Sequence, residues 1–286
     1  LATPAASSTD NATTDIDFTL PEAASSGTVK MTFTHTSGTA DNNAPHIITF
    51  NSNFETASQH TTTLTGTDLS VNANVLSVNT NTNDALVEGA TYSVTIEYQD
   101  VVGNTAASVT NTNFTYDLTT AAPTLATPAA SSTDNAVINI DFTLPEAASS
   151  GTVKMTFTHT SGTADNNAPH IITFTSNFET ASQHTTILWG RNLDVNANVL
   201  SVDTNPNDAL VDGAIYSVKI EYQDEAGNTA ASVTNTNFTY DLTTVAPTLA
   251  TPAASSTDNA TTDIDFTLPE AATSGTVKMT FTRTSG

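Results

Sequence analysis

The clearest strand signal in this chain is the stretch Ala90-Thr91-Tyr92-Ser93-Val94-Thr95-Ile96-Glu97-Tyr98. Apolar or aromatic side chains stand at positions 92, 94, 96 and 98, and polar ones stand between them. An alternation of period two places each set of side chains on its own face of a β-strand. The stretch therefore predicts a strand with one buried face and one face toward water.

Weaker alternating stretches lie on both sides of this one. They run over 15–20, 29–34, 46–51, 60–64, 69–78 and 107–118. Clusters of Gly, Asn, Asp and Pro separate them, and these residues are typical of turns. Roughly seven short strands within about 120 residues, with no helical stripe, predict an antiparallel β-sandwich of two sheets.

The whole pattern repeats with a period of 124 residues. Residues 1–12 recur at 125–136 and at 249–260, and 1–124 differs from 125–248 at 17 positions. The segment 249–286 differs from 1–38 at two positions, Thr273 for Ser25 and Arg283 for His35. A unit of this length can bury its own core. We predict two modules, 1–124 and 125–248, and the first two strands of a third at 249–286. Since both ends carry the same segment, 39–162 and 163–286 are an alternative framing. We expect the chain to be part of a longer array.

One motif in the last third of each repeat resembles the tyrosine corner of fibronectin type III and related immunoglobulin-like domains. Its residues are Leu86, Gly89 and Tyr92 in the first repeat and Leu210, Gly213 and Tyr216 in the second. The resemblance implies that the tyrosine opens the penultimate strand and that its hydroxyl bonds to the backbone of the preceding loop.

Two further segments are similar to bacterial immunoglobulin-like repeats. One is the Asp-x-x-Gly-Asn hairpin at 100–104, and the other is the closing tail from Phe114 to Thr124. The resemblance implies tandem immunoglobulin-like (fibronectin type III-like) β-sandwich modules joined by short proline-containing linkers. It also implies a protein outside the cell or on the surface of a bacterium or archaeon.

The charge balance excludes several classes of partner. The chain has 29 acidic and 6 basic residues, and its net charge of −23 divides into −11, −10 and −2 over the three copies. Such a chain lacks the basic stripe that nucleic acids require, and anionic membranes repel it. The sequence contains no stretch of 18 apolar residues, which a membrane-spanning helix would need. It also contains no cysteine, so it offers no disulfide, no thiolate ligand and no thiol nucleophile.

Oxygen-bearing side chains in loops near the module ends are candidate calcium ligands, since Ca²⁺ binds carboxylate and amide oxygens. No loop has the EF-hand spacing, and Asp and Asn are also ordinary turn residues. Both interpretations stay open. The candidates are Asp10, Asn11, Glu22, Asp100, Asn104 and Asp117, together with Asp134, Asn135, Asp224, Asn228 and Asp241.

Each full repeat carries three histidines, which are His35, His46 and His60 in the first. Three convergent histidines hold Zn²⁺ in some proteins. Because Arg283 replaces the first of them in the third copy, we expect exposed polar strand residues instead. The sequence has no Gly-x-Ser-x-Gly elbow and no phosphate-binding loop, so we expect no enzyme activity.

These observations favour a structural segment of a long extracellular repeat protein that forms a surface stalk or filament. Its expected partners are other copies of itself or the rest of its array, with strand complementation of 249–286. The alternative is an adhesin that binds a host protein or a glycan, either with or without calcium. Trp189 and Arg191, which replace Thr65 and Thr67 of the first repeat, form its candidate contact patch. An accessory domain of a secreted hydrolase is a third alternative.

Overall fold

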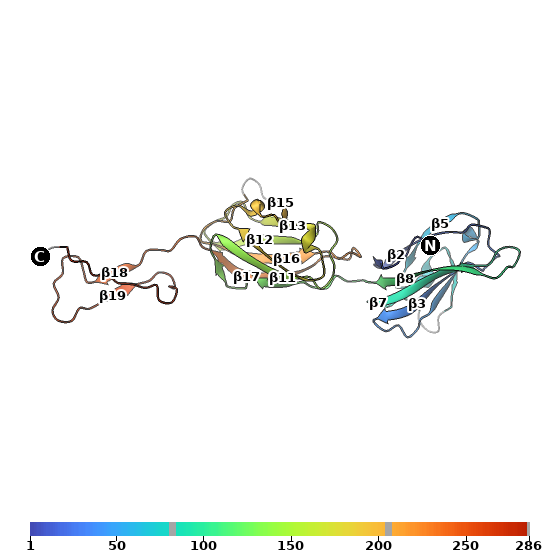
Figure 1. Ribbon diagram of the computed structural model, residues 1–286, viewed down its shortest axis with the longest axis horizontal. Coiled ribbons are helices and arrows are strands. Elements are labelled where there is room, and N and C mark those ends of the chain that lie inside the picture. Colours follow the sequence, from blue (N-terminus) through green and yellow to red (C-terminus); the bar gives the residue numbers. More distant parts are fainter. Residues whose placement is uncertain (80–83, 204–207, 285–286) are drawn as a thin grey trace.

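The computed structural model describes residues 1–79, 84–203 and 208–284, and the last two residues of the third copy lie outside this range. The chain is all-β and has several sheets. Figure 1 shows the first repeat, the second repeat and the third copy following one another along the longest axis. One apolar core is built from residues between Leu1 and Leu118, and a separate one from residues between Leu125 and Leu242.

The first repeat forms a six-stranded sheet in the order β1-β8-β7-β3-β4-β6 and a second sheet in which β2 pairs with β5. All pairs are antiparallel except β1 with β8. The elements are β1 (Thr9–Asp10), β2 (Thr13–Thr19), β3 (Lys30–Gly38), β4 (His46–Phe50), η1 (Ser52–Phe54), β5 (Gln59–Thr65), η2 (Leu69–Val71), β6 (Val75–Val78), β7 (Ala90–Tyr98) and β8 (Ala107–Tyr116).

The second repeat has a large sheet of the same topology, and its smaller sheet has one additional strand. Its large sheet runs in the order β10-β17-β16-β12-β13-β15, and its smaller sheet in the order β14-β11-β9. The elements are β9 (Thr124–Thr127), β10 (Thr133–Asp134), β11 (Val137–Thr143), β12 (Lys154–Gly162), β13 (His170–Phe174), η3 (Ser176–Phe178), β14 (Gln183–Trp189), η4 (Leu193–Val195), β15 (Val199–Val202), β16 (Ala214–Tyr222) and β17 (Ala231–Tyr240).

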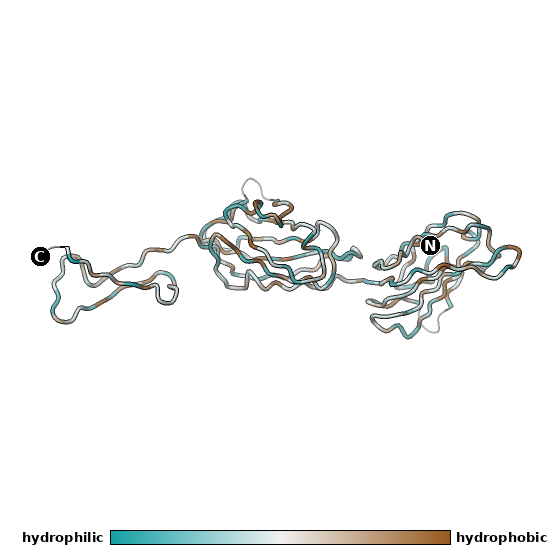
Figure 2. Tube along the Cα trace, in the orientation of Figure 1, coloured by the Kyte–Doolittle hydropathy of each residue, from teal (hydrophilic) through white to brown (hydrophobic). Residues whose placement is uncertain are grey.

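Alternation in the sequence becomes alternation of burial. Along β7 every second residue is buried, from Ala90 to Tyr98, and hydropathy changes along the strands in the same way (Figure 2). The ring of Phe18 on β2 lies 5.6 Å from that of Phe50 on β4. The inner faces of the two sheets therefore pack against each other, which is the arrangement of a β-sandwich.

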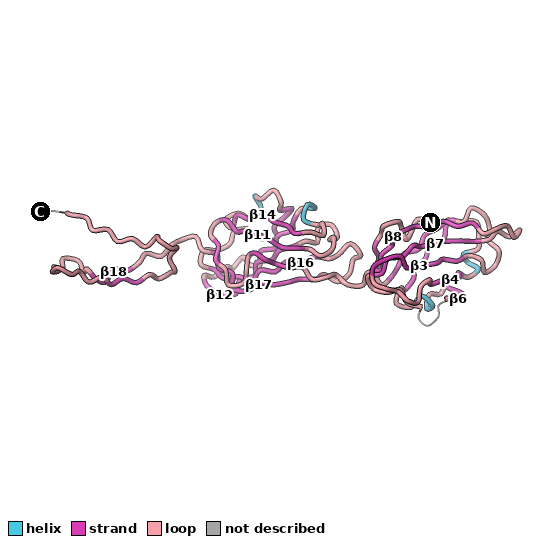
Figure 3. Tube along the Cα trace, turned by 60° about the horizontal axis from the view of Figure 1, so that its bottom comes forward, coloured by secondary structure: helices cyan, strands magenta, loops and turns pink. Residues whose placement is uncertain are grey.

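The expected strand over 69–78 is shorter than predicted. It is divided into the 3-10 helix η2 and the strand β6, and the short helices are visible in Figure 3. The Asp68 carboxylate accepts a hydrogen bond from the Ser70 amide at 3.1 Å, and the Asn72 side chain donates to the Thr63 carbonyl. These local side-chain bonds compete with the strand ladder.

The expectation of exposed histidines is wrong for two of the three in each repeat. His46 and His60 are buried, and so are His170 and His184. His60 packs between phenylalanine rings, 5.5 Å from Phe18 and 5.1 Å from Phe54. The imidazole of His60 thus serves as an aromatic core side chain, and its Nε2 lies 2.8 Å from the Thr56 carbonyl oxygen.

The third copy has little regular structure. Strand β18 (Thr248–Thr251) pairs with β19 (Asp265–Thr267), while residues 277–281 form no strand. The counterpart of 278–281 in the first repeat belongs to β3, which pairs with β4 and β7. The chain to residue 286 contains no copy of these two strands for the third repeat. The apolar residues left exposed are Leu249, Ile264, Phe266, Leu268, Val277, Met279 and Phe281.

Among the residues described, no helix has the length and apolar character needed to cross a membrane.

Candidate functional site at the junction of two repeats

The loop between β16 and β17 faces the first repeat and has a shape that its own sequence produces. The Asp224 carboxylate is almost fully buried and accepts hydrogen bonds from the Asn228 amide at 3.0 Å and from its side chain at 2.9 Å. Gly227 has a φ of 80°, which favours glycine. Asp100 and Asn104 make the same bonds in the first repeat, so the loop needs no neighbour to adopt this shape.

Side chains from this loop and from the first repeat bond across the junction. The Asn228 side chain donates to the Asp117 carbonyl at 3.1 Å, while the Asn11 side chain donates to the Ala226 carbonyl at 2.9 Å. The Thr120 hydroxyl donates to the Asp224 carboxylate at 2.8 Å. The loop is therefore held by the end of β8, by the connection after it and by the segment after β1.

The connection between the repeats also bonds to side chains of the second repeat, through Ala121. The Tyr222 hydroxyl donates to the Ala121 carbonyl at 2.7 Å, and the Ala121 amide donates to the Glu146 carboxylate at 2.9 Å. Each interrepeat bond uses a backbone or side-chain group that would otherwise need water. Successive repeats thus meet through a defined set of polar contacts.

Three carboxylates converge at the junction. Oxygens of Asp117, Glu146 and Asp224 lie within 4.8 Å of one another. The pKa of the Asp117 carboxyl rises to about 6, first because the group is buried and then because Glu146 and Asp224 carry negative charge close by. The ionised cluster therefore destabilises the junction that the hydrogen bonds stabilise.

Such a cluster has the chemistry of a hard-cation site, because carboxylate and carbonyl oxygens are the usual ligands of Ca²⁺. Of the predicted ligands, Asp117 and Asp224 belong to the cluster. The third member, Glu146, was not among the predicted residues. It is the counterpart of Glu22 one period on, so the repeat itself carried the signal.

Of the remaining predicted ligands, Asn11 and Asn228 lie at this junction, where their side-chain amides donate hydrogen bonds, and the others lie outside the cluster. Asp10 accepts hydrogen bonds from the amides of Asn11 and Asp15, which makes it a turn residue. Glu22 lies beside Tyr98, with 3.4 Å between carboxylate and hydroxyl, at the end of the first repeat away from this junction. That end also carries Asp100 and Asn104.

The second repeat presents Asp134, Asn135 and Asp241 at its far end. Asp241 accepts from the Thr243 amide at 3.1 Å, as Asp117 does from Thr119. The Val245 amide donates to Glu270 at 3.2 Å, which reproduces the bond between Ala121 and Glu146. The geometry of the connection is thus partly repeated before the third copy.

The tyrosine-corner residues are part of a buried network. The Tyr92 hydroxyl accepts from the Val87 amide at 2.9 Å and donates to the Asp41 carboxylate at 2.7 Å. His46 Nε2 lies 2.7 Å from the same carboxylate. Burial alone would raise the pKa of Asp41, but the bonds from Tyr92 and His46 outweigh it and lower that pKa. Leu86 is buried, and Gly89 has a positive φ.

The second repeat contains the same network, with the Tyr216 hydroxyl 2.9 Å from the Val211 amide and 2.6 Å from Asp165. Leu210 is buried and Gly213 has a positive φ. In both repeats the side chains of the Asp–His pair are inaccessible to solvent. A substrate has no access to either pair, and their bonds instead fix one loop to the core.

Trp189 and Arg191 are not at the junction with the first repeat. Trp189 ends β14 with 47% of its surface exposed, and Arg191 follows in an exposed turn.

In comparisons with known proteins, no family model matches the chain, and no curated protein matches it.

Proposed function

We propose that this chain is a structural segment of a long extracellular repeat protein that forms a stalk or filament on a bacterial or archaeal surface. Its units are tandem immunoglobulin-like (fibronectin type III-like) β-sandwich modules joined by short proline-containing linkers. The proposed mechanism is geometric and involves no catalysis: each module buries its own core, and polar contacts at each junction set the direction of the next module.

The observation that carries the proposal is the interrepeat bonding of Asn228. Its side chain donates to the Asp117 carbonyl of the preceding repeat while also donating to Asp224 of its own loop. A flexible linker would leave these groups to water. Because the Asp-x-x-Gly-Asn loop occurs in each full repeat, at 100–104 and at 224–228, the contact can recur along an array.

A divalent cation, most simply Ca²⁺, is the proposed cofactor of the junction. Asp117, Glu146 and Asp224 supply three carboxylates to one point, and a bound cation would remove their mutual repulsion. The dense negative charge of the chain gives the same cation a role between neighbouring rods, where it would offset the repulsion of their surfaces.

The proposed partners are further repeats of the same array or other copies of the chain. The large apolar residues of 249–286 are exposed, whereas all of their counterparts in the first repeat except the half-buried Leu1 are buried in the core that β4, β7 and β8 help to form. Strands supplied by following sequence or by a second copy would complete this unit.

The rod is tested by small-angle X-ray scattering of the chain and of two variants. Asn228→Ala removes an interrepeat bond, and we expect a broader distribution of interatomic distances with a shorter maximum. Asn104→Ala removes the equivalent side chain from the loop of the first repeat, where it contacts no other repeat. It is the matched control. Equal scattering from all three proteins would contradict the proposal.

The cation is tested separately by calorimetric melting in chelator and in millimolar calcium. We expect calcium to raise the melting temperature of the native chain and to have a much smaller effect on Asp117→Asn. An unchanged melting temperature in calcium would contradict the proposed cation and would not affect the proposal of a rod.

Completion of the third copy is tested by extending the chain after Gly286 with a copy of residues 163–248. We expect the amides of 264–281 to become protected from hydrogen exchange, because their strand partners are then present. Continued rapid exchange in the extended chain would contradict strand completion.

A further inference from the structure

The two full repeats differ most in one small region of the surface. Eight of their 17 differences fall in the pair of strands β2 and β5 and the turn after β5, or in their counterparts. These differences are Thr13→Val137, Thr14→Ile138, Asp15→Asn139, Thr63→Ile187, Thr65→Trp189, Thr67→Arg191, Asp68→Asn192 and Ser70→Asp194. Thr14 and Ile138 are buried, whereas the other changed strand positions, which are 13, 15, 63 and 65 and their counterparts, lie on the outer face of this sheet.

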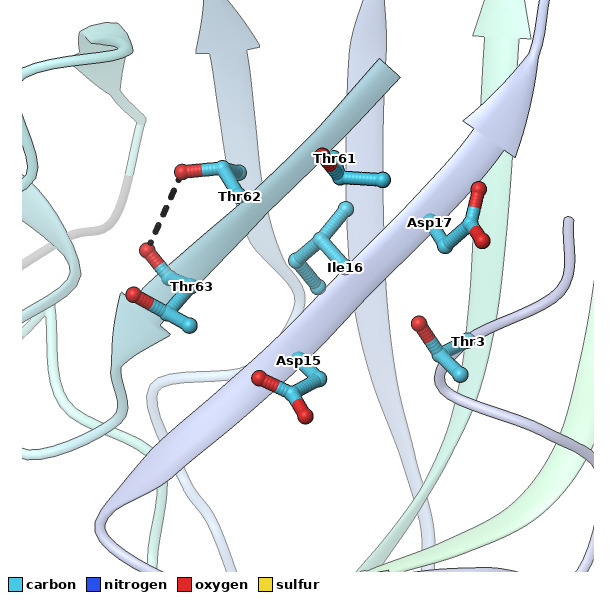
Figure 4. A pocket seen from close by; sticks show the side chains of 7 residues that line it. All are labelled: Thr3, Asp15, Ile16, Asp17, Thr61, Thr62 and Thr63. Carbon is cyan, nitrogen blue, oxygen red and sulfur yellow. Dashed lines mark hydrogen bonds between the residues drawn. The ribbon is translucent and has the colours of Figure 1, made fainter. Parts of the chain in front are cut away.

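In the first repeat this outer face is polar and acidic. Figure 4 shows a shallow groove there, lined by Asp15 and Asp17 of β2, by Thr61 and Thr63 of β5 and by neighbouring residues. The register places Asp15 directly opposite Thr63. A ligand that meets this face encounters carboxylates and hydroxyls and no aromatic ring.

The second repeat has an apolar and aromatic face at the same place. The register pairs Val137 with Trp189 and Asn139 with Ile187, so the four changed side chains form two adjacent cross-strand pairs. Cβ atoms of such pairs are about 5 Å apart. Trp189 and Ile187 are 47% and 40% exposed, so the substitutions add apolar surface without burying it.

The groove persists beside these residues with a volume of about 670 Å³. Asn139, Thr185 and Ile187 line it, and Asp141 at its rim accepts two hydrogen bonds from Gln183. Hydroxyl and amide groups therefore lie next to an exposed indole. This combination of a flat apolar surface and hydrogen-bonding groups suits a ligand with both characters.

Charge defines the ligand further. Asn139 and Asn192 replace Asp15 and Asp68, and Arg191 adds a positive charge, while Asp194 is the one change in the opposite direction. The rest of the chain remains strongly acidic and repels polyanions. The face thus loses negative charge without becoming a basic patch, which favours an uncharged ligand over a nucleic acid or an acidic polysaccharide.

The area of these two strands is smaller than the area that one partner of a stable protein complex usually buries. Strands β11 and β14 have seven residues each. At ~3.3 Å per residue and ~10 Å for the width of two strands, they present roughly 230 Å². A stable protein complex buries about 800 Å² on each partner. One extended chain of sugar rings needs only a contact area of this smaller size.

We infer that the outer face of β11 and β14 binds a neutral glycan chain, with Trp189 stacking on the apolar face of a sugar ring. Ile187 and Val137 extend the apolar floor, and Asn139 and Thr185 offer hydrogen bonds to ring hydroxyls. This binding site is independent of the proposed rod function, which the first repeat serves without these residues.

The two repeats supply matched variants for the test. The first variant carries Val137→Thr, Asn139→Asp, Ile187→Thr and Trp189→Thr, so that the second repeat takes the residues of the first. The reciprocal variant carries Thr13→Val, Asp15→Asn, Thr63→Ile and Thr65→Trp. Every introduced residue already occupies the equivalent strand position in this chain, and circular dichroism melting verifies that both variants fold.

The probes are cellohexaose, xylohexaose, mannohexaose and chitohexaose, with hexagalacturonate as the anionic control. Trp189 is the only tryptophan, so its fluorescence reports directly on this face. We expect at least one neutral hexasaccharide to shift the emission saturably. By calorimetry we expect one site on the native chain, a loss of at least tenfold in affinity in the first variant, and two sites on the reciprocal variant.

Several results would overturn the inference. They are the absence of binding by all four neutral sugars, equal binding by the first variant, and tighter binding of hexagalacturonate. Self-association of the native chain that the first variant abolishes, measured by sedimentation in the absence of sugar binding, would assign the face to a protein contact instead.

Discussion

Replacement of Asp117 by asparagine tests the electrostatics of the junction most sharply. The pKa of Asp117 rises from its ordinary value of 3.8 to about 6. A pKa difference of this size corresponds to ~3 kcal/mol, and contact with water reduces the expected effect to about 1 to 2 kcal/mol. The asparagine side chain keeps an oxygen for the Thr119 amide and adds a donor toward the neighbouring carboxylates. Asp117→Asn should therefore stabilise the chain at pH 7.5 in chelator.

The sign of the pH dependence follows from the raised pKa. Between about pH 4 and pH 6 the folded protein keeps a proton on Asp117 that the unfolded chain has lost. The free energy of unfolding of the native chain therefore falls as pH rises through this window. The gain from Asp117→Asn should be present at pH 7.5 and absent at pH 3.5.

The assay is differential scanning calorimetry at both pH values in chelator. We expect the melting temperature to rise by about 3–5 °C at pH 7.5. Asp241→Asn is the control, because Asp241 has the same turn geometry but lies away from Glu146 and Asp224. A lower melting temperature for Asp117→Asn at pH 7.5, or an equal rise in both variants, would refute the reasoning.

Three further outcomes are expected inside the repeats. Thr14 is buried with an unpaired hydroxyl, and Ile138 fills its place in the second repeat. Thr14→Ile should raise the free energy of unfolding in urea by about 1–2 kcal/mol. A lower free energy of unfolding would contradict this reasoning. Tyr92→Phe removes the acceptor of the Val87 amide and one donor to the Asp41 carboxylate, which keeps its contact with His46. It should cost about 1–3 kcal/mol, whereas a neutral result would show that the Tyr92 hydroxyl adds no stability. The lowered pKa of Asp41 contributes stability above about pH 4, and this stability is lost as pH falls through the pKa of the folded state. Asp41→Asn should therefore weaken the fall of the melting temperature at acid pH. An unchanged fall of the melting temperature at acid pH would contradict this.

The strands were predictable from the sequence where one face is buried and the other exposed, because apolar and polar residues then alternate with a period of two. The stretch ending at Tyr98 coincides with β7 because one face of that strand meets the core and the other meets water. The same rule failed at 69–78, because Asp68 and Asn72 bond to nearby backbone and interrupt the ladder. Periodicity contains no information about such local competition.

The sequence predicted the type of candidate site, a cluster of oxygen ligands, but only some of the residues that form it. Loop carboxylates near the repeat ends were identified from composition, but which of them converge depends on how one repeat is set against the next. Asp117 and Asp224 are 107 positions apart, and Glu146 completes the cluster from a third segment. The buried pair of Asp41 and His46 was missed, since a histidine on an alternating strand looks alike whether its partner is water or a carboxylate.

The distance between equivalent points of successive repeats reports whether the junction fixes the direction of the rod. The chain has no cysteine, so Thr34→Cys and Thr158→Cys place two spin labels at exposed strand positions one period apart. We predict a single narrow distance distribution by pulsed electron paramagnetic resonance, which Asn228→Ala broadens. A distribution that is already broad in the otherwise native chain, and that Asn228→Ala leaves unchanged, would contradict a junction that sets the direction of the rod.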